Sequence, residues 1–167
     1  NCLTGRAEYH RETSDSDRLL DLCKASSSLP FVAPIAKVDG VPMLDGGITD
    51  PIPIEHAVAQ GFSHNVVVLT HNRGYRDEGS DIRMPSFVYK KYPRLRVALS
   101  HIKEVYNDKI ELVERLEESG RALIICPEHP LEVDRFGTRT DRLQALYEEG
   151  YACAERILTS DYGKSFL

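Results

Sequence analysis

The stretch Val41-Pro42-Met43-Leu44-Asp45-Gly46-Gly47 carries a short apolar run directly into a carboxylate and two glycines. The apolar run predicts a strand that ends at the acidic residue. Catalytic and ligand-binding groups of α/β proteins favour strand ends, where the loops open outward. Paired glycines allow a sharp turn and the close approach of another group. The carboxylate of Asp45 is therefore placed to act as a general base, provided that a nucleophile lies within hydrogen-bond reach.

An Asp-Gly pair by itself is weak evidence, because such pairs are common in turns. Asp39-Gly40 lies six residues earlier, between the apolar runs 35–38 and 41–44. Both central residues of a tight hairpin turn need positive φ, which favours Asp-Gly. The sequence therefore predicts a β-hairpin that leads into the Asp45-Gly46-Gly47 turn.

The segments on either side of the hairpin show start and stop signals of their own. Residues 1–3 read as the tail of a strand. Ser14 or Asp15 predicts the N-cap of a helix that carries Leu19, Leu20 and Cys23 on one side and ends near residues 26–28. After the turn, a helix is expected from Pro53 to Gln60 with Gly61 as its C-cap, followed by a strand at 65–70 buried on both faces.

The second half of the chain alternates in the same way. Residues 71–86 read as a loop or domain seam. One long helix is predicted from Pro93 to just before Gly120, then a buried strand at 122–126 and a last helix over about 140–158. Alternation of apolar strands with helices favours a layered α/β sheet with helices on its faces.

Composition excludes several classes of protein. The 167 residues carry a net charge of −5, which argues against a nucleic-acid binder. No stretch approaches the roughly 20 apolar residues that span a bilayer, and no signal peptide is evident. The four cysteines are scattered, which favours reduced thiols and a cytoplasmic setting. Cys126 and His129 have a ligand-like spacing but no second pair, so a structural metal is not expected.

Several of these motifs, in this order, carry a resemblance. Ala25-Ser26-Ser27-Ser28-Leu29-Pro30 precedes the hairpin, the Asp45-Gly46-Gly47 turn and the proline-rich stretch that ends at Pro53. The series resembles the second half of the patatin-like phospholipase family over residues 1–72. Residues 73–92 then form a seam, and residues 93–167 resemble the α/β C-terminal extension of bacterial patatin-like proteins. The resemblance implies a patatin-like α/β/α sheet fragment with a helix-rich extension.

The resemblance also implies a chemistry. In this family a serine in a G-x-S-x-G elbow and an aspartate in the Asp-Gly-Gly turn form a dyad, so Asp45 would activate the serine without a histidine. A glycine-rich loop would supply the oxyanion hole. The implied reaction is hydrolysis of a lipid acyl ester through an acyl-enzyme, with no metal or organic cofactor.

The sequence departs from the family at the nucleophile. It contains no G-x-S-x-G, and the nearest stretch, Gly61-Phe62-Ser63-His64-Asn65, ends in asparagine and follows the aspartate. We therefore interpret Ser63 as a loop or cap residue. We interpret the chain as the C-terminal portion of a hydrolase, inactive alone. The N-terminal half of the same protein would be its partner.

Two other functions stay open. The chain could be a non-catalytic module on a patatin-like scaffold that binds a protein or a lipid surface, because residues 73–96 interleave basic and aromatic side chains suited to peripheral membrane contact. It could also be an unrelated enzyme that uses Asp45 with His56 or His64. A truncated sheet would expose a strand edge, so we also expect the chain to cover that edge, either by forming a homodimer or by rearranging.

Overall fold

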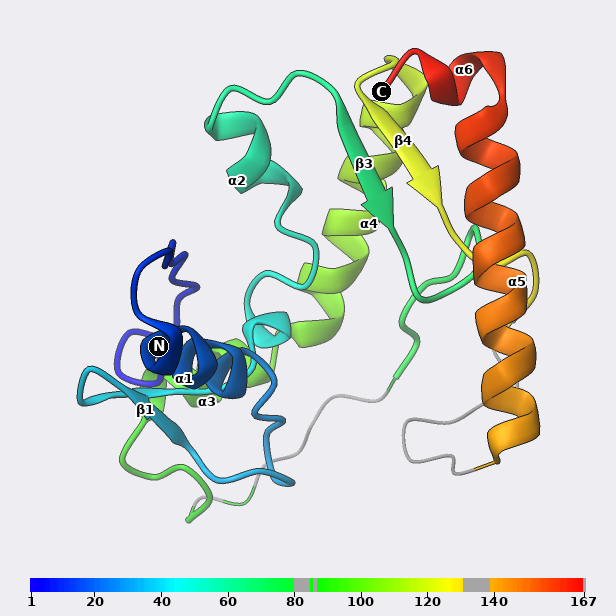
Figure 1. The fold of residues 1–167 in the computed structure, drawn as a ribbon. Helices are drawn as coiled ribbons and strands as arrows, with labels where there is room; N and C mark the ends of the chain where they lie inside the picture. Colours follow the sequence, from blue (N-terminus) through cyan, green and yellow to red (C-terminus); the bar gives the residue numbers. More distant parts are fainter. Residues whose placement is uncertain (80–84, 86, 131–138, 167) are drawn as a thin grey trace. The chain divides into compact units, whose positions relative to one another are not determined.

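The computed structural model describes residues 1–79, 85, 87–130 and 139–166 (Figure 1). These residues fold into two compact units, Asn1–Ile52 with Asp77–Lys109 (unit 1) and Pro53–Arg76 with Ile110–Leu167 (unit 2). The elements, in chain order, are α1 (Ser16–Ser26), β1 (Ala36–Val38), β2 (Val41–Met43), the 3-10 helix η1 (Gly46–Ile48), α2 (Ile54–Ala59), β3 (Asn65–Val68), α3 (Pro93–Leu99), α4 (Ile102–Glu118), β4 (Ala122–Ile125), α5 (Thr140–Thr159) and α6 (Asp161–Lys164).

Helix α1 and the β1–β2 hairpin form where the capping and turn residues of the sequence predict them. Asp15 caps α1 by accepting a hydrogen bond from the Arg18 N–H, 2.9 Å away. The strands β1 and β2 pair antiparallel around Asp39 and Gly40, whose φ angles of 51° and 80° are those of the predicted tight turn. Helix α1 packs against β1 (Figure 1). It does so through Leu22 and Ala25, whereas the predicted face of Leu19, Leu20 and Cys23 is exposed.

A second apolar cluster in unit 1 joins three segments that are distant in sequence. It is built from the buried residues Cys2, Leu44, Ile48, Leu95 and Leu99. Leu44 and Ile48 flank the Asp45 turn, and the two leucines come from α3. The turn is therefore fixed against α3 by apolar packing on both of its sides.

Two secondary-structure predictions for this part of the sequence are wrong. Residues 1–3 make a turn instead of a strand, because Asn1 Oδ1 accepts hydrogen bonds from the N–H groups of Leu3 and Thr4 and so competes with strand pairing. The long helix expected from Pro93 is divided into α3 and α4. At the break, the Ser100 hydroxyl donates to the Val97 carbonyl, and the His101 ring also lies within hydrogen-bond distance of that carbonyl.

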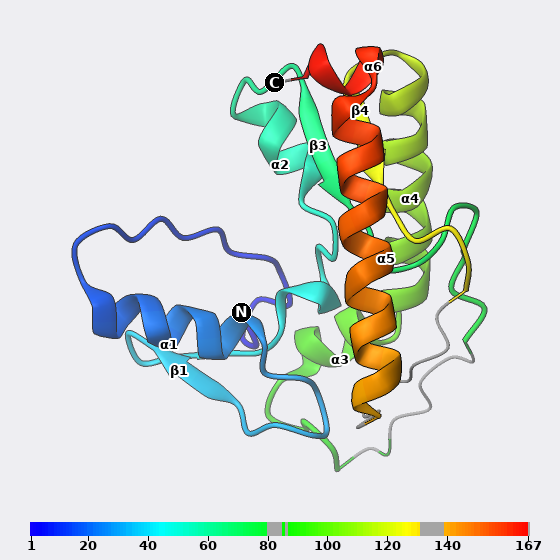
Figure 2. The same ribbon diagram turned by 45° about the vertical axis from the view of Figure 1, so that its right-hand side comes forward.

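Unit 2 is built around β3 and β4, which pair in parallel with Val67 opposite Ile124. All four residues of β4 are buried, as predicted, and α5 lies against this strand (Figure 2). The prediction that β3 is buried on both faces is wrong, because Val66 is 44% exposed and Val68 is 70% exposed. Their side chains share one face of the strand, so β3 is covered on the Val67 face alone.

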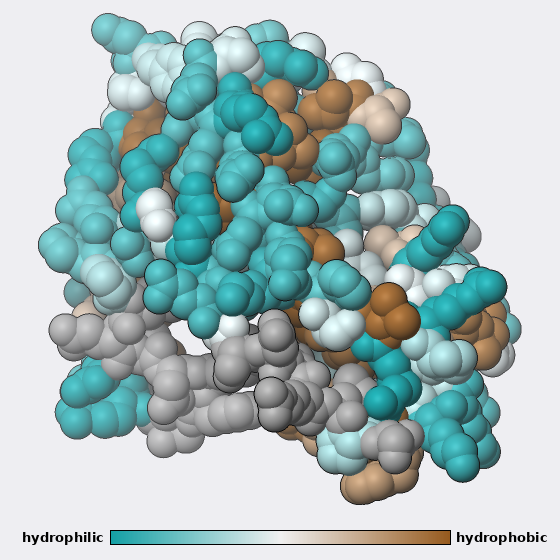
Figure 3. Space-filling model, turned by 180° about the vertical axis from the view of Figure 1, so that it is seen from behind, coloured by the Kyte–Doolittle hydropathy of each residue, from teal (hydrophilic) through white to brown (hydrophobic). Residues whose placement is uncertain are grey.

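The α/β class predicted from the sequence is confirmed, with a small patatin-like α/β part and a helix-rich extension. In the described residues, the four strands form two separate two-stranded sheets. The domain boundaries near residues 72 and 93 stay a prediction. None of the described helices combines the length and the apolar character needed to cross a bilayer. On the face drawn in Figure 3, hydrophilic residues predominate and hydrophobic ones gather in separate groups.

Gly5 and Gly40 provide a matched test of the packing in unit 1. Both have positive φ, but a Cβ at Gly5 would lie 2.5 Å from the Arg94 carbonyl oxygen of α3, whereas a Cβ at Gly40 would meet nothing within 4 Å. Gly40→Ala should cost about 1–2 kcal/mol of backbone strain. Gly5→Ala should cost roughly 1–3 kcal/mol more, because a backbone atom must move. Urea unfolding measures both, and equal losses would contradict the close approach of Gly5 to α3.

Candidate functional site

The Asp45 carboxylate lies where β2 ends and η1 begins. Leu44 and Ile48 on either side are buried, and Asp45 itself is half-buried. Its main-chain N–H donates to the Ser28 carbonyl oxygen, 3.0 Å away, and its Oδ1 accepts the Gly47 N–H at 2.7 Å. Within the described residues, Oδ2 has no hydrogen-bond partner. The side chain is thus held at one oxygen and open at the other.

Gly47 is needed for space, Gly46 is not, and neither glycine is needed for an unusual backbone angle. Neither Gly46 nor Gly47 has a positive φ. A Cβ at Gly47 would lie 3.0 Å from Asp45 Oδ1, which is tighter than an ordinary contact, whereas a Cβ at Gly46 would lie 3.8 Å from the Ser26 hydroxyl oxygen. Gly47 therefore leaves room for the carboxylate to fold over the start of η1.

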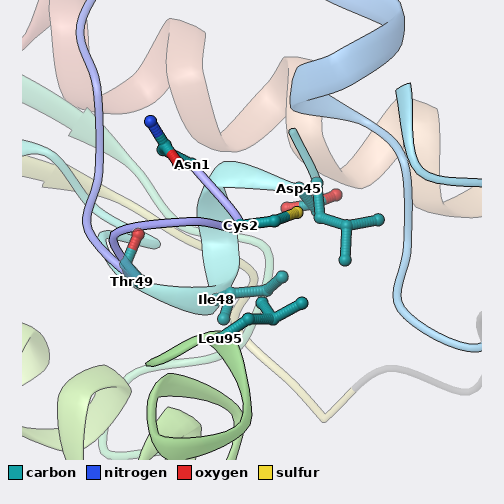
Figure 4. Close-up of a pocket in the computed structure, with 8 residues that line it drawn as sticks. Asn1, Cys2, Asp45, Ile48, Thr49 and Leu95 are labelled. Atoms are coloured by element: carbon teal, nitrogen blue, oxygen red, sulfur yellow. The ribbon is translucent and has the colours of Figure 1, made fainter. Parts of the chain in front are cut away.

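A small, partly open pocket adjoins the turn (Figure 4). Its empty space, including the open mouth, is about 220 Å³. Burial raises the pKa of the Cys2 thiol, which keeps it protonated at neutral pH. The lining residues are Asn1, Cys2, Gly5, Leu44, Asp45, Ile48, Thr49 and Leu95.

Ser28 and Asp50 also take part in the turn. The run Ser26-Ser27-Ser28 predicts helix-end residues that shape the site and are not nucleophiles. Ser28 is buried, and its hydroxyl donates to the Lys24 carbonyl at 2.7 Å while its own carbonyl receives the Asp45 N–H. Asp50 precedes Pro51, and this context predicts a turn or cap carboxylate. Its side chain instead accepts a hydrogen bond from the Tyr9 hydroxyl and lies 3.3 Å from Lys109 Nζ. No local pattern connects these distant positions.

The alternative catalytic residues belong to unit 2. Ser63 and His64 lie on the exposed loop before β3, with the Ser63 hydroxyl 3.0 Å from the His64 Nδ1. His56 lies on α2. All three belong to unit 2, whereas Asp45 belongs to unit 1. Ser63 therefore occupies the loop position that its sequence context predicts.

Among the described residues of the basic and aromatic stretch 73–96, some side chains are engaged within their unit and others are exposed. Arg73 pairs with Glu117 and Arg76 pairs with Glu114 in unit 2. In unit 1, Tyr89 and Tyr92 pack against the second apolar cluster. Phe87 is 76% exposed. Arg83 lies outside the described residues.

Metal-binding groups do not gather in the part of the chain that the structure describes, since no three His, Cys, Asp or Glu side chains there are placed to hold an ion. Cys126 accepts a hydrogen bond at its carbonyl from the Cys153 thiol, at 3.0 Å. Burial raises the pKa of the Cys126 thiol. The raised pKa keeps the Cys126 thiol protonated at neutral pH.

The segment that carries the Asp45 turn is similar to a known family. Residues 4–58, which include the Asp45 turn, match the family model of patatin-like phospholipases. This part of the chain belongs to that family. Residues 92–160 match the model of a domain of unknown function, DUF6363. The two matched segments are separated by residues 59–91, which include β3.

One curated relative matches most of the chain. The chain is 30% identical over 144 residues to the uncharacterized protein YjjU of Escherichia coli K12, an alignment that covers 84% of this chain. The chain spans about 40% of the length of that relative. No solved structure matches the chain. The comparisons therefore relate the patatin-like part of the chain to a phospholipase family.

Gly47 and Gly46 allow a direct test of the carboxylate geometry. Gly47→Ala should displace the Asp45 side chain and weaken its bond to the residue 47 N–H, because the added Cβ crowds Oδ1. Gly46→Ala has room for its Cβ and serves as the control. Amide hydrogen exchange at residue 47 should accelerate in the first variant alone. Equal exchange in both variants would show that Oδ1 does not cap this amide.

Proposed function

We propose that this chain supplies Asp45 as the general base of a serine lipid acyl hydrolase. The observation that carries the proposal is the open Oδ2 of a half-buried carboxylate, held at a strand end within the segment that matches the patatin-like model. A base needs one oxygen that is free to take a proton and a fixed orientation. The Gly47 N–H gives Asp45 that orientation without occupying both oxygens.

In the proposed mechanism, Asp45 takes the serine proton directly, without a histidine between the two residues. Asp45 takes the proton of a serine hydroxyl, and the serine oxygen attacks the ester carbonyl. The carbonyl re-forms as the alcohol leaves with the proton from Asp45, which yields an acyl-enzyme. The same carboxylate then activates water, whose attack releases the fatty acid and restores the serine. This chain contributes the base, and the serine belongs to another part of the protein.

The proposed substrate is a lipid acyl ester, and the proposed setting is the cytoplasm with contact at a membrane surface. Phe87 supports such contact, since it is exposed beside Lys90 and Lys91, which are also exposed. The N-terminal half of the same protein would bring the nucleophile. Association of two copies stays part of the proposal.

Asp45→Asn in the complete gene product tests the base. An asparagine oxygen caps a helix start as well as an aspartate oxygen does, so the fold should be retained. An amide cannot take the serine proton, so kcat toward a short-chain p-nitrophenyl ester should fall by at least about 100-fold. The melting temperature should stay close to that of the unmodified protein.

Asp39→Asn is the matched control. It removes a carboxylate from the other Asp-Gly turn, where asparagine also tolerates the positive φ of 51°. Activity should be unchanged in this variant. Near-normal turnover by Asp45→Asn would refute the role of Asp45. An inactive complete protein that binds liposomes would favour the non-catalytic module instead.

A further inference from the structure

Asp50 is a buried carboxylate with two partners in unit 1. Its side chain is 6% exposed, and that of Lys109 is 13% exposed. Lys109 Nζ lies 3.3 Å from Asp50 Oδ1, which is ion-pair distance, although the two groups are not aligned for a hydrogen bond. Tyr9 donates its hydroxyl to Oδ2. The carboxylate is thus enclosed between the segment before α1 and helix α4.

Burial of a charge needs compensation. A carboxylate removed from water is strongly disfavoured unless an opposite charge or hydrogen-bond donors replace the solvent. Lys109 supplies the charge, and the tyrosine supplies one donor. Asp50 Oδ1 has no aligned hydrogen-bond donor. The positive charge of Lys109 therefore offsets the free-energy cost of burying this oxygen.

The backbone of Asp50 connects this cluster to the Asp45 turn. Its N–H donates to the Gly46 carbonyl oxygen at 2.9 Å, and the Thr49 N–H donates to the same oxygen at 3.1 Å. Gly46 is the residue directly after Asp45. Fixing the Asp50 side chain therefore fixes the end of the short turn whose beginning carries the proposed base.

We propose that Lys109 is a positioning residue for Asp45, acting through its ion pair with Asp50. The inference rests on the proposed role of Asp45 as general base. Lys109 lies in the segment 92–160 that matches the domain of unknown function. One role of that segment is then to hold the catalytic turn of the patatin-like segment.

Lys109→Met in the complete gene product tests this role, with Lys24→Met as the matched control. Lys24 also pairs with an aspartate, Asp21, but those side chains are 71% and 54% exposed. Exposed pairs contribute little. Lys109→Met should lower kcat toward a p-nitrophenyl ester by roughly 10–100-fold, because small displacements of a reacting group are costly. KM should change less than threefold.

Two further variants separate positioning from general damage. Lys109→Arg keeps the charge and should restore most of kcat. The double variant Asp50→Asn with Lys109→Met leaves no unpaired buried charge, so it should be more active than Lys109→Met alone. A purely structural role would lower the melting temperature and leave kcat per folded molecule unchanged.

Hydrogen exchange gives a readout that is independent of turnover. Amides of residues 46–50 should exchange at least tenfold faster in Lys109→Met than in Lys24→Met. The inference is overturned if exchange is unchanged, if kcat stays within twofold of the unmodified protein, or if Lys109→Arg and the double variant recover no activity. In each of these cases an inactive Asp45→Asn would leave the proposed function standing. Normal turnover by Asp45→Asn would instead remove both proposals.

Discussion

Burial of Leu44 and Ile48 on either side of Asp45 is the constraint that sets the geometry of unit 1. Both side chains pack with Cys2, Leu95 and Leu99, so the backbone between them has little freedom. A carboxylate cannot join that apolar cluster without losing its solvation. Asp45 is therefore directed toward the adjoining pocket by its neighbours, and its bond to the Gly47 N–H fixes the remaining rotation.

The features that could be predicted from the sequence are those set by neighbouring residues. Asp39 and Gly40 specify their hairpin because few residue pairs tolerate two positive φ angles. Asp15 caps α1 by accepting a hydrogen bond from the N–H of the residue three positions ahead. Gly61, with a φ of 92°, lies just after the end of α2. The turn of Asp45 belongs to this group, since a strand end and paired glycines lie within a few residues.

The features that could not be predicted depend on contacts between distant segments. Helical spacing continues across Ser100, so periodicity alone gave one helix where the structure has two. An apolar strand such as β3 has the same sequence whether one face or both are covered. Asp50 precedes Pro51 and reads as a turn residue, because nothing near it indicates Tyr9 or Lys109. Burial and charge pairing arise in the tertiary structure.

The Asp50–Lys109 pair has a consequence for how the two matched segments can evolve. The carboxylate lies within residues 4–58, and its cation lies within residues 92–160. A recombination event that replaced either segment alone would leave a buried charge without its counterpart. The two segments are therefore expected to evolve together. A chimera built from two such proteins would need to take the residues at positions 50 and 109 from the same parent.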